Sequence, residues 1–192
     1  MNTMQIKKIV IMVTLIALMA ATRMHHFGSA LHLPDASLAV FLLAGFLISS
    51  PLLLGALLLE AGALDYTAIS YLGVDDFCVT PAYWFLIPTY AALWFAGRYY
   101  ARIHNNSLRS LAMFSGVAFT AINVAFVLSN GSFYLFSGRY ADMGIAQYAA
   151  QIAQYYLPYV SGAVIYLIPA AILYALFTRH ADRQSSFVND GR

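Results

Sequence analysis

The residue whose chemistry stands out in this sequence is its single cysteine, Cys78. It lies in the segment Asp-Asp-Phe-Cys-Val-Thr-Pro, residues 75–81. A thiolate is a strong, soft metal ligand, but Asp75 and Asp76 oppose its formation by like-charge repulsion, so we expect a raised pKa for the thiol. One cysteine excludes an internal disulfide, and disulfide exchange lacks a resolving partner. Two interpretations remain: a small buried hydrophobic residue, or a ligand for a metal that arrives inside a larger molecule.

Further polar candidates lie between the apolar stretches. His25 and His26 fit either interfacial polar residues or the lining of a pocket. Asp35 precedes an Ala-Ser pair at a predicted helix start, where we expect it to act as a cap. Asp65 and, less strongly, Glu60 are site candidates, because ionisable groups near a membrane segment are usually functional.

A glutamine face follows later in the chain. Its members recur at helical spacing: Gln147, Gln151 and Gln154. Tyrosines surround them, so the segment predicts an amphipathic cap lying across a pocket mouth, with amide groups for a ligand rich in amides. The alternative is an interfacial helix with a tyrosine belt.

Composition places these residues in a membrane protein. The 192 residues are 61% hydrophobic and only 9% charged, against about 25% charged in soluble domains. This composition indicates that the protein is surrounded by a lipid bilayer. A net charge of +2 and the lack of a basic run with aromatics indicate no nucleic acid partner. No zinc-binding spacing and no phosphate-binding loop occurs.

The hydrophobic pattern predicts an all-α membrane protein with six transmembrane helices in a single domain, residues 1–183, followed by a flexible tail, 184–192. The predicted spans are 7–24, 36–49, 51–64, 81–101, 108–130 and 156–178. Residues 36–64 fit either one kinked helix or a hairpin broken at Ser49-Ser50-Pro51. Residues 9–21 resemble a signal peptide, but we expect an uncleaved first helix.

The positive charges decide the number of spans. With six helices and both termini in the cytoplasm, only Arg23 and Arg139 lie outside among the lysines and arginines. Five helices would move Arg98, Arg102 and Arg109 outside, against the positive-inside rule. We therefore predict a multi-pass protein of the bacterial inner membrane. Its longer loops, 24–35, 65–80 and 131–155, would close over an extracytoplasmic pocket.

The chain resembles the S-components of energy-coupling-factor (ECF) vitamin transporters. Ala17 and Ala21 are similar to the AxxxA motif with which those proteins contact a coupling subunit, although small residues at this spacing are common. Within that superfamily the resemblance is to BtuM-like cobalamin transporters. It rests on three segments: Arg-Met-His-His-Phe-Gly at 23–28, Asp65, and Asp-Phe-Cys-Val-Thr-Pro-Ala-Tyr at 76–83.

The resemblance implies a function and a set of site residues. Cys78 would be the axial ligand of the cobalt in cobalamin, which is the transported substrate. The accompanying cobalamin-binding residues would be Asp65, Tyr83, His26 and, on a looser alignment, Arg139. Removal of cyanide from cyanocobalamin at Cys78 is associated with this family. An ECF coupling module would drive uptake, or the protein would act alone.

Two other functions stay open. One is an S-component for another vitamin, such as riboflavin or thiamine, which needs no thiol. The other is a membrane thiol- or metal-handling protein that uses Cys78 with His25, His26 and Asp65.

Overall fold

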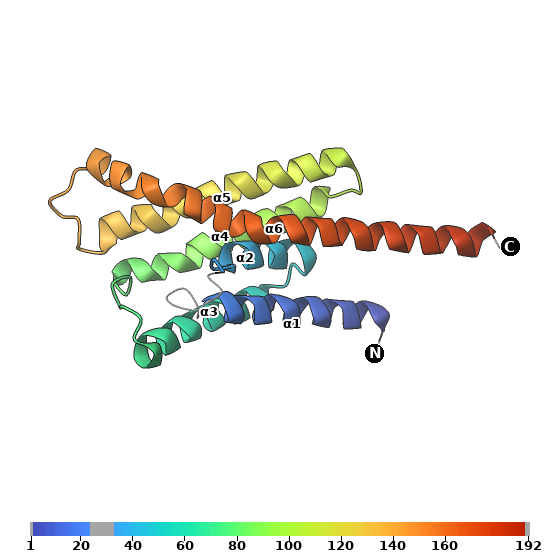
Figure 1. The fold of residues 1–192 in the computed structure, drawn as a ribbon, viewed down its shortest axis with the longest axis horizontal. Helices are drawn as coiled ribbons and strands as arrows, with labels where there is room; N and C mark the ends of the chain where they lie inside the picture. Colours follow the sequence, from blue (N-terminus) through green and yellow to red (C-terminus); the bar gives the residue numbers. More distant parts are fainter. Residues whose placement is uncertain (1, 24–32, 191–192) are drawn as a thin grey trace.

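The computed structural model describes residues 2–23 and 33–190, and within these ranges the fold is helical with no strand. Six α-helices and one 3-10 helix follow one another along the chain: α1 (Thr3–Arg23), α2 (Ser37–Leu47), α3 (Pro51–Leu72), η1 (Pro81–Phe85), α4 (Leu86–Ile103), α5 (Leu108–Phe136) and α6 (Ile145–Asp190). The α-helices run alternately in opposite directions, so that the start of α1 and the end of α6 lie at the same end of the bundle (Figure 1). We call this the terminal end and the opposite one the loop end.

Four of the helices in the described ranges are long and apolar enough to cross a membrane: α1, α3, α5 and α6. The α2 helix has only 11 residues. The α4 helix has 18 residues and carries Arg98 and Arg102. The chain is therefore a helical protein of membrane type, while six crossings and the location of its termini stay predictions.

The choice at residues 36–64 is resolved as a hairpin. The α2 helix ends at Leu47, Ser49 takes a left-handed backbone conformation (φ 53°), and α3 begins with Pro51 at its first turn. The Ser50 hydroxyl caps α3 by accepting a hydrogen bond from the Leu53 amide. Proline is favourable there because the first helical N–H has no intrahelical partner.

Three helices continue past the ends that we predicted from hydropathy. The α3 helix runs to Leu72 instead of residue 64, α5 runs to Phe136 instead of residue 130, and α6 starts at Ile145 instead of residue 156. Half of the predicted loop 65–80 and most of the predicted loop 131–155 are thus helical. Polar residues ended the apolar runs, but their side chains bond within the helix: Thr67 Oγ1 donates to the Ala63 carbonyl and Ser132 Oγ to that of Ser129. At its other end α6 is helical to Asp190, into the segment predicted as a tail.

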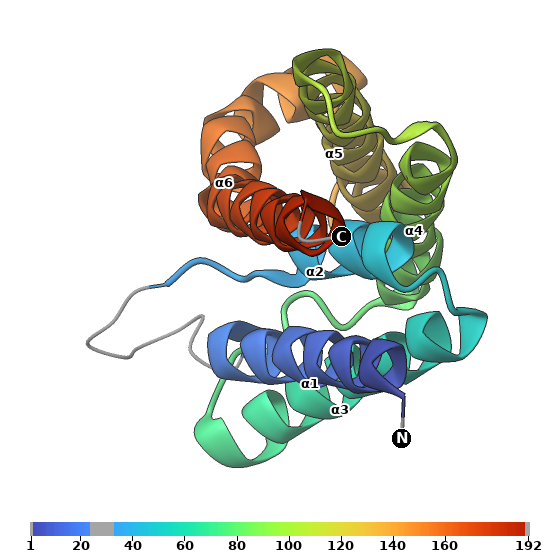
Figure 2. The same cartoon turned by 90° about the vertical axis from the view of Figure 1, so that its right-hand side faces the viewer.

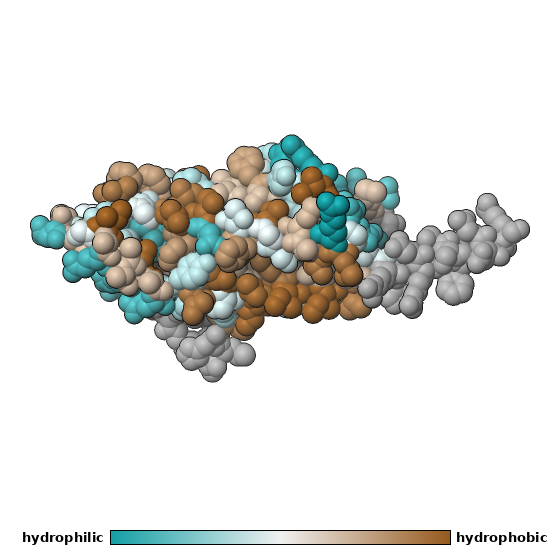
Figure 3. All heavy atoms as spheres, turned by 90° about the horizontal axis from the view of Figure 1, so that it is seen from above, coloured by the Kyte–Doolittle hydropathy of each residue, from teal (hydrophilic) through white to brown (hydrophobic). Residues whose placement is uncertain are grey.

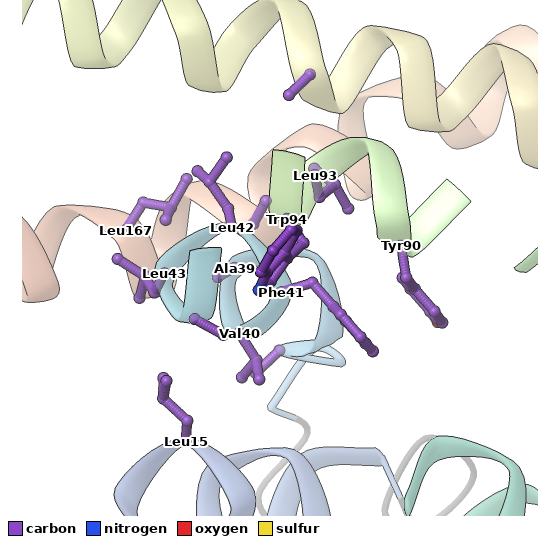
Figure 4. Packing of buried hydrophobic residues seen from close by; sticks show 14 of the residues in the cluster. Leu15, Ala39, Val40, Phe41, Leu42, Leu43, Tyr90, Leu93, Trp94 and Leu167 are labelled. Carbon is purple, nitrogen blue, oxygen red and sulfur yellow. The ribbon is translucent and has the colours of Figure 1, made fainter. Parts of the chain in front are cut away.

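The α2 helix forms the centre of the fold. It lies between the α1–α3 layer and the α4–α5–α6 layer (Figure 2) and packs most extensively against α4. Eight of its 11 residues are buried, as expected for a helix that is apolar on all sides. Phe41 stacks on Tyr90 of α4 with ring centroids 4.3 Å apart, and Trp94 packs beside them (Figure 4). The core thus consists of α2 and the helices around it.

Two glycines allow α2 and α4 to approach closely. A Cβ atom on Gly45 would lie 2.0 Å from the Trp94 carbonyl oxygen. One on Gly97 would lie 2.0 Å from the Leu42 carbonyl oxygen. Both obstacles are backbone atoms, so no side-chain movement relieves the clash. Small residues serve this purpose wherever helix backbones meet in a membrane.

The outer surface is apolar in its middle. Figure 3 shows a broad hydrophobic band on the face seen from above, with hydrophilic residues gathered toward the two ends. On α1, Leu15, Met19 and Thr22 are buried, whereas Ala17 and Ala21 are exposed. The two alanines are therefore available to a lipid or a partner helix; the coupling-subunit contact stays a prediction.

A histidine joins three elements at the terminal end. The His104 ring, in the turn after α4, lies 2.9 Å through Nε2 from the Tyr174 hydroxyl of α6 and 2.8 Å through Nδ1 from the Tyr100 hydroxyl. Phe46 of α2 meets the imidazole edge-on at 5.2 Å between ring centroids. These contacts hold α6 and α2 against the α4–α5 turn.

We predict that Gly97→Ala lowers the thermal unfolding temperature of the detergent-solubilised protein substantially. The added methyl group forces α2 and α4 apart, and overpacking of this kind costs about 1–3 kcal/mol or more. Gly116→Ala is the matched control, because a Cβ there meets nothing within 4 Å. It should be neutral or slightly stabilising. Equal unfolding temperatures for the two variants would show that the close approach is unimportant.

Candidate functional site

A cavity of about 580 Å³ opens at the loop end of the bundle. Its wall contains residues from five α-helices, η1 and three loops, among them Cys78, Asp65 and Tyr83. Most of the remaining lining is aromatic or aliphatic: Ala68, Ile69, Val74, Phe77, Val79, Ala82, Leu86, Tyr90, Phe133, Tyr140, Tyr148, Ile152 and Tyr155. An apolar pocket with a few convergent polar groups is the usual form of a small-molecule site.

Arg23 is the centre of the polar network in this cavity. Arg23 is the last residue of α1, and its side chain is only 9% exposed. Its Nε and Nη2 atoms donate to the two oxygens of Asp65 on α3, at 2.7 and 2.6 Å. Nη1 donates to Asp35 at 3.1 Å, to the Ser37 hydroxyl at 2.8 Å and to the Tyr90 hydroxyl at 2.8 Å. The two-pronged pairing with Asp65 is strong and directional. Together with the bonds from Nη1, it joins α1 to α2, α3 and α4.

Asp35 precedes the N-cap of α2, which is Ala36 and not Asp35 as we predicted, but its carboxylate still binds the first turn of the helix. Its Oδ1 atom accepts from the backbone amide and hydroxyl of Ser37, at 2.9 and 2.6 Å, in the first turn of α2. Its Oδ2 atom pairs with Arg23. The same carboxylate therefore stabilises a helix start and completes the network.

Tyr83 reaches the network from the 3-10 helix η1. Pro81 opens the 3-10 helix η1, and the Tyr83 amide donates to the Thr80 carbonyl at 2.8 Å. This short turn directs the Tyr83 hydroxyl to Asp65 Oδ2, to which it donates at 2.6 Å. The predicted association of Asp65 with Tyr83 in one site is thus present in the fold.

Cys78 lies on a tight loop at the rim. The Asp75 carboxylate accepts from the Phe77 amide at 2.6 Å, and the Val79 amide donates to the Asp76 carbonyl at 2.7 Å. These turns place the thiol on the cavity wall while leaving it exposed. A thiol in this position is accessible to a ligand, which excludes the interpretation of Cys78 as a buried hydrophobic residue.

The pKa of the Cys78 thiol is raised, as we expected. The first cause is burial, because the surrounding protein removes part of the hydration that a thiolate needs. Arg139 opposes the increase, whereas Asp65 and Asp75 add to it. Of the two aspartates that we predicted to repel the thiolate, Asp75 contributes and Asp76 does not, and burial was missing from the prediction.

Arg139 belongs to the rim and not to the cavity wall. The residue is exposed, and its guanidinium carbon lies 4.0 Å from the centroid of the Phe77 ring. This cation–π contact links the loop after α5 to the loop that carries Cys78. Arg139 therefore acts on the thiol by charge and by holding a neighbouring residue.

The predicted site residues thus divide into three groups. Cys78, Asp65 and Tyr83 line one cavity, Arg139 lies at its rim, and His26 lies outside the described residues. Glu60, the weaker candidate, does not line the cavity. The glutamine face is the first part of α6 and not a separate cap, although Gln151 does reach the cavity.

The sequence reasoning missed the central role of Arg23. It also missed two polar wall residues of α5, Ser129 and Asn130, and the Tyr90 hydroxyl. One signal was available: Arg23, Asp35 and Asp65 all lie near predicted helix ends on the same side of the membrane. Charges of opposite sign at such positions usually pair.

Comparison with known proteins adds no family assignment. No protein-family model matches the chain, and a search of curated proteins finds no relative.

We predict that Arg23→Ala destabilises the protein by about 3–5 kcal/mol, the usual cost of leaving buried ionic partners unpaired. Two carboxylates lose their counter-charge, and four helices lose a shared contact. Thermal unfolding in detergent measures the effect. Arg139→Ala is the control, because this exposed arginine makes one cation–π contact and should contribute about 1 kcal/mol or less. Equal stability of the two variants would contradict a structural role for the network.

We predict that alkylation of Cys78 by iodoacetamide has a midpoint at higher pH than alkylation of free cysteine. The thiolate is the reacting form, and burial raises the pKa of this thiol. Arg139→Ala should move the midpoint further up, because Arg139 lowers the pKa. Asp75→Asn should move it down. A wild-type midpoint at or below that of free cysteine would show that burial does not control the thiol.

Proposed function

We propose that this protein takes up cobalamin across the bacterial inner membrane, with Cys78 as the axial ligand of the cobalt. The observation that carries the proposal is the exposed thiol of Cys78 on the wall of a cavity whose other polar residues include Asp65 and Tyr83. These residues come from the segments on which the resemblance to BtuM-like transporters rests. Their meeting in one cavity supports a shared site.

The chemistry of the thiol suits a cobalt that arrives in a corrin. A raised pKa keeps Cys78 protonated in the empty site, and a bound metal then deprotonates a coordinating thiol. Among the described residues no group of three or more histidine, cysteine or acidic side chains could hold a metal ion. A single protein ligand is sufficient for a cobalt already held by the corrin nitrogens.

The size and lining of the cavity are compatible with partial enclosure of this ligand. A cavity of about 580 Å³ falls within the range of roughly 300–1,000 Å³ that holds drug-sized molecules. A corrinoid is larger, so part of it would project between the rim loops. Phe77, Phe133 and Tyr140 offer aromatic surface to the corrin, and Gln151 offers amide groups.

Removal of cyanide follows from this coordination. A thiolate opposite the cyanide donates electron density to cobalt and favours loss of the ligand. We treat this reaction as a consequence of binding at Cys78, and its turnover is not required for uptake.

Uptake requires the loop end to face outward. We propose six membrane crossings with α2 shielded by its neighbours, and both termini in the cytoplasm. The cationic residues Lys7, Lys8, Arg98, Arg102 and Arg109 then lie on the inner side. An ECF coupling module bound at Ala17 and Ala21, or the protein alone, would complete transport.

Cys78→Ala tests the coordination directly. We expect purified wild-type protein to bind cobalamin with a visible spectrum that differs from that of the free cofactor. The variant should bind with an altered cobalt spectrum and lose decyanation, while its unfolding temperature changes little because the thiol is exposed. Asp142→Asn, an exposed substitution outside the cavity wall, is the control. Identical spectra for wild type and Cys78→Ala would refute coordination by sulfur.

The orientation has its own test, because Cys78 is the single cysteine and needs no engineered background. We expect a membrane-impermeant maleimide to label Cys78 in cells whose outer membrane is permeabilised. Prior cobalamin should protect the thiol. Labelling only after disruption of the inner membrane would place the cavity on the cytoplasmic side and exclude uptake by this route.

A further inference from the structure

The polar floor of the cavity has a particular hydrogen-bonding character. We define the floor as Arg23, Asp35, Asp65 and Tyr83, all of which line the cavity. Most donor groups on this floor are committed to the protein itself. All three nitrogens of the Arg23 guanidinium donate to protein oxygens, and one of the two Nη2 hydrogens has no partner within the described residues. The single O–H of Tyr83 donates to Asp65.

The acceptors are not exhausted. A carboxylate offers about four acceptor positions. Asp65 accepts three bonds, from Arg23 Nε, Arg23 Nη2 and the Tyr83 hydroxyl. Asp35 also accepts three, from Arg23 Nη1 and from the amide and hydroxyl of Ser37. Within the described part of the chain each carboxylate therefore retains acceptor capacity, and the Tyr83 oxygen retains its lone pairs.

The charge of the floor also favours ligands that carry donor groups. Asp35 and Asp65 share the guanidinium of Arg23, so these three side chains together carry a formal charge of −1. An incoming carboxylate would meet two carboxylates that already share the one cation of the floor. An incoming amide or ammonium group would find acceptors already held in place by Arg23.

We propose that this floor determines specificity: it selects ligands that present N–H or O–H donors and rejects ligands that present a carboxylate. Arg23 is the positioning residue, because two of its nitrogens hold Asp65 and the third holds Asp35 in the cavity wall. Applied to corrinoids, the inference rests on the proposed function and predicts preference for amidated corrinoids over those with free acid side chains.

Cys78 provides a probe that does not depend on the identity of the ligand. Iodoacetamide and iodoacetate are nearly identical in size, and each loses iodide to the same thiolate. The ratio of their alkylation rates therefore cancels any difference in the pKa of the thiol. We measure this ratio on the purified full-length protein and on free cysteine under the same conditions.

We expect the ratio of amide to acid reagent to be about fivefold higher in the wild type than in Asp65→Asn, because the variant removes one nearby negative charge. The charges of Arg139 and Asp75, which also act on Cys78, are the same in both proteins. Asp35→Asn provides a second variant should the first fail to fold. Asp142→Asn should keep the wild-type ratio. The same ratio in the wild type and both floor variants would overturn the inference.

A second pair of ligands separates this inference from the proposed function. Cobalamin is compared with its monocarboxylate derivative, in which one side-chain amide is hydrolysed. Tighter binding of cobalamin, lost in Asp65→Asn, supports both. Equal affinity of the two corrinoids overturns the specificity of the floor while leaving cobalamin uptake intact. If neither corrinoid binds, the proposed function fails, and the alkylation ratio still decides the specificity.

Discussion

The ion pair between Arg23 and Asp65 is the interaction on which the loop end of this protein depends. A guanidinium that is 9% exposed is costly to bury, and only a matched set of acceptors makes the position tolerable. Those acceptors come from α2, α3 and α4, so that the position of α1 is tied to three other helices by one side chain. The same bonds orient Asp65 and, through it, Tyr83. Stability and the geometry of the cavity therefore have a common origin.

This dependence explains why the cavity combines a rigid floor with a rim of different construction. The floor is built from helix ends and short directional bonds. The rim consists of two loops joined by the stacking of Arg139 on Phe77. A cation–π contact at an exposed position is worth about 0.5–1 kcal/mol, much less than a buried bidentate pair. A large ligand would therefore displace the rim before it disturbed the floor, and Cys78 lies where the two parts meet.

The sequence was informative about class and about the position of chemistry, and weaker about helix length. Composition and charge were sufficient for an all-helical membrane-type protein, and the proline after Ser49-Ser50 indicated the break between α2 and α3. Hydropathy misjudged α3, α5 and α6, because polar residues such as Thr67 and Ser132 bond to their own helix and do not end it. Arg23 was missed because a contact between residues 23 and 65 is a property of packing, which no local pattern encodes.

The two ends of the bundle are built differently, and this difference bears on how a ligand would leave. At the terminal end the Tyr100 hydroxyl donates to the Ser110 carbonyl at 3.0 Å and lies 2.8 Å from His104 Nδ1. His104 Nε2 lies 2.9 Å from the Tyr174 hydroxyl. Phe46 and Phe114 pack around these rings. These packed rings join α2, α4, α5 and α6 at the terminal end. Under the proposed uptake, release on the opposite side would require either separation of α6 from the α4–α5 turn or reorientation of the whole bundle in the membrane.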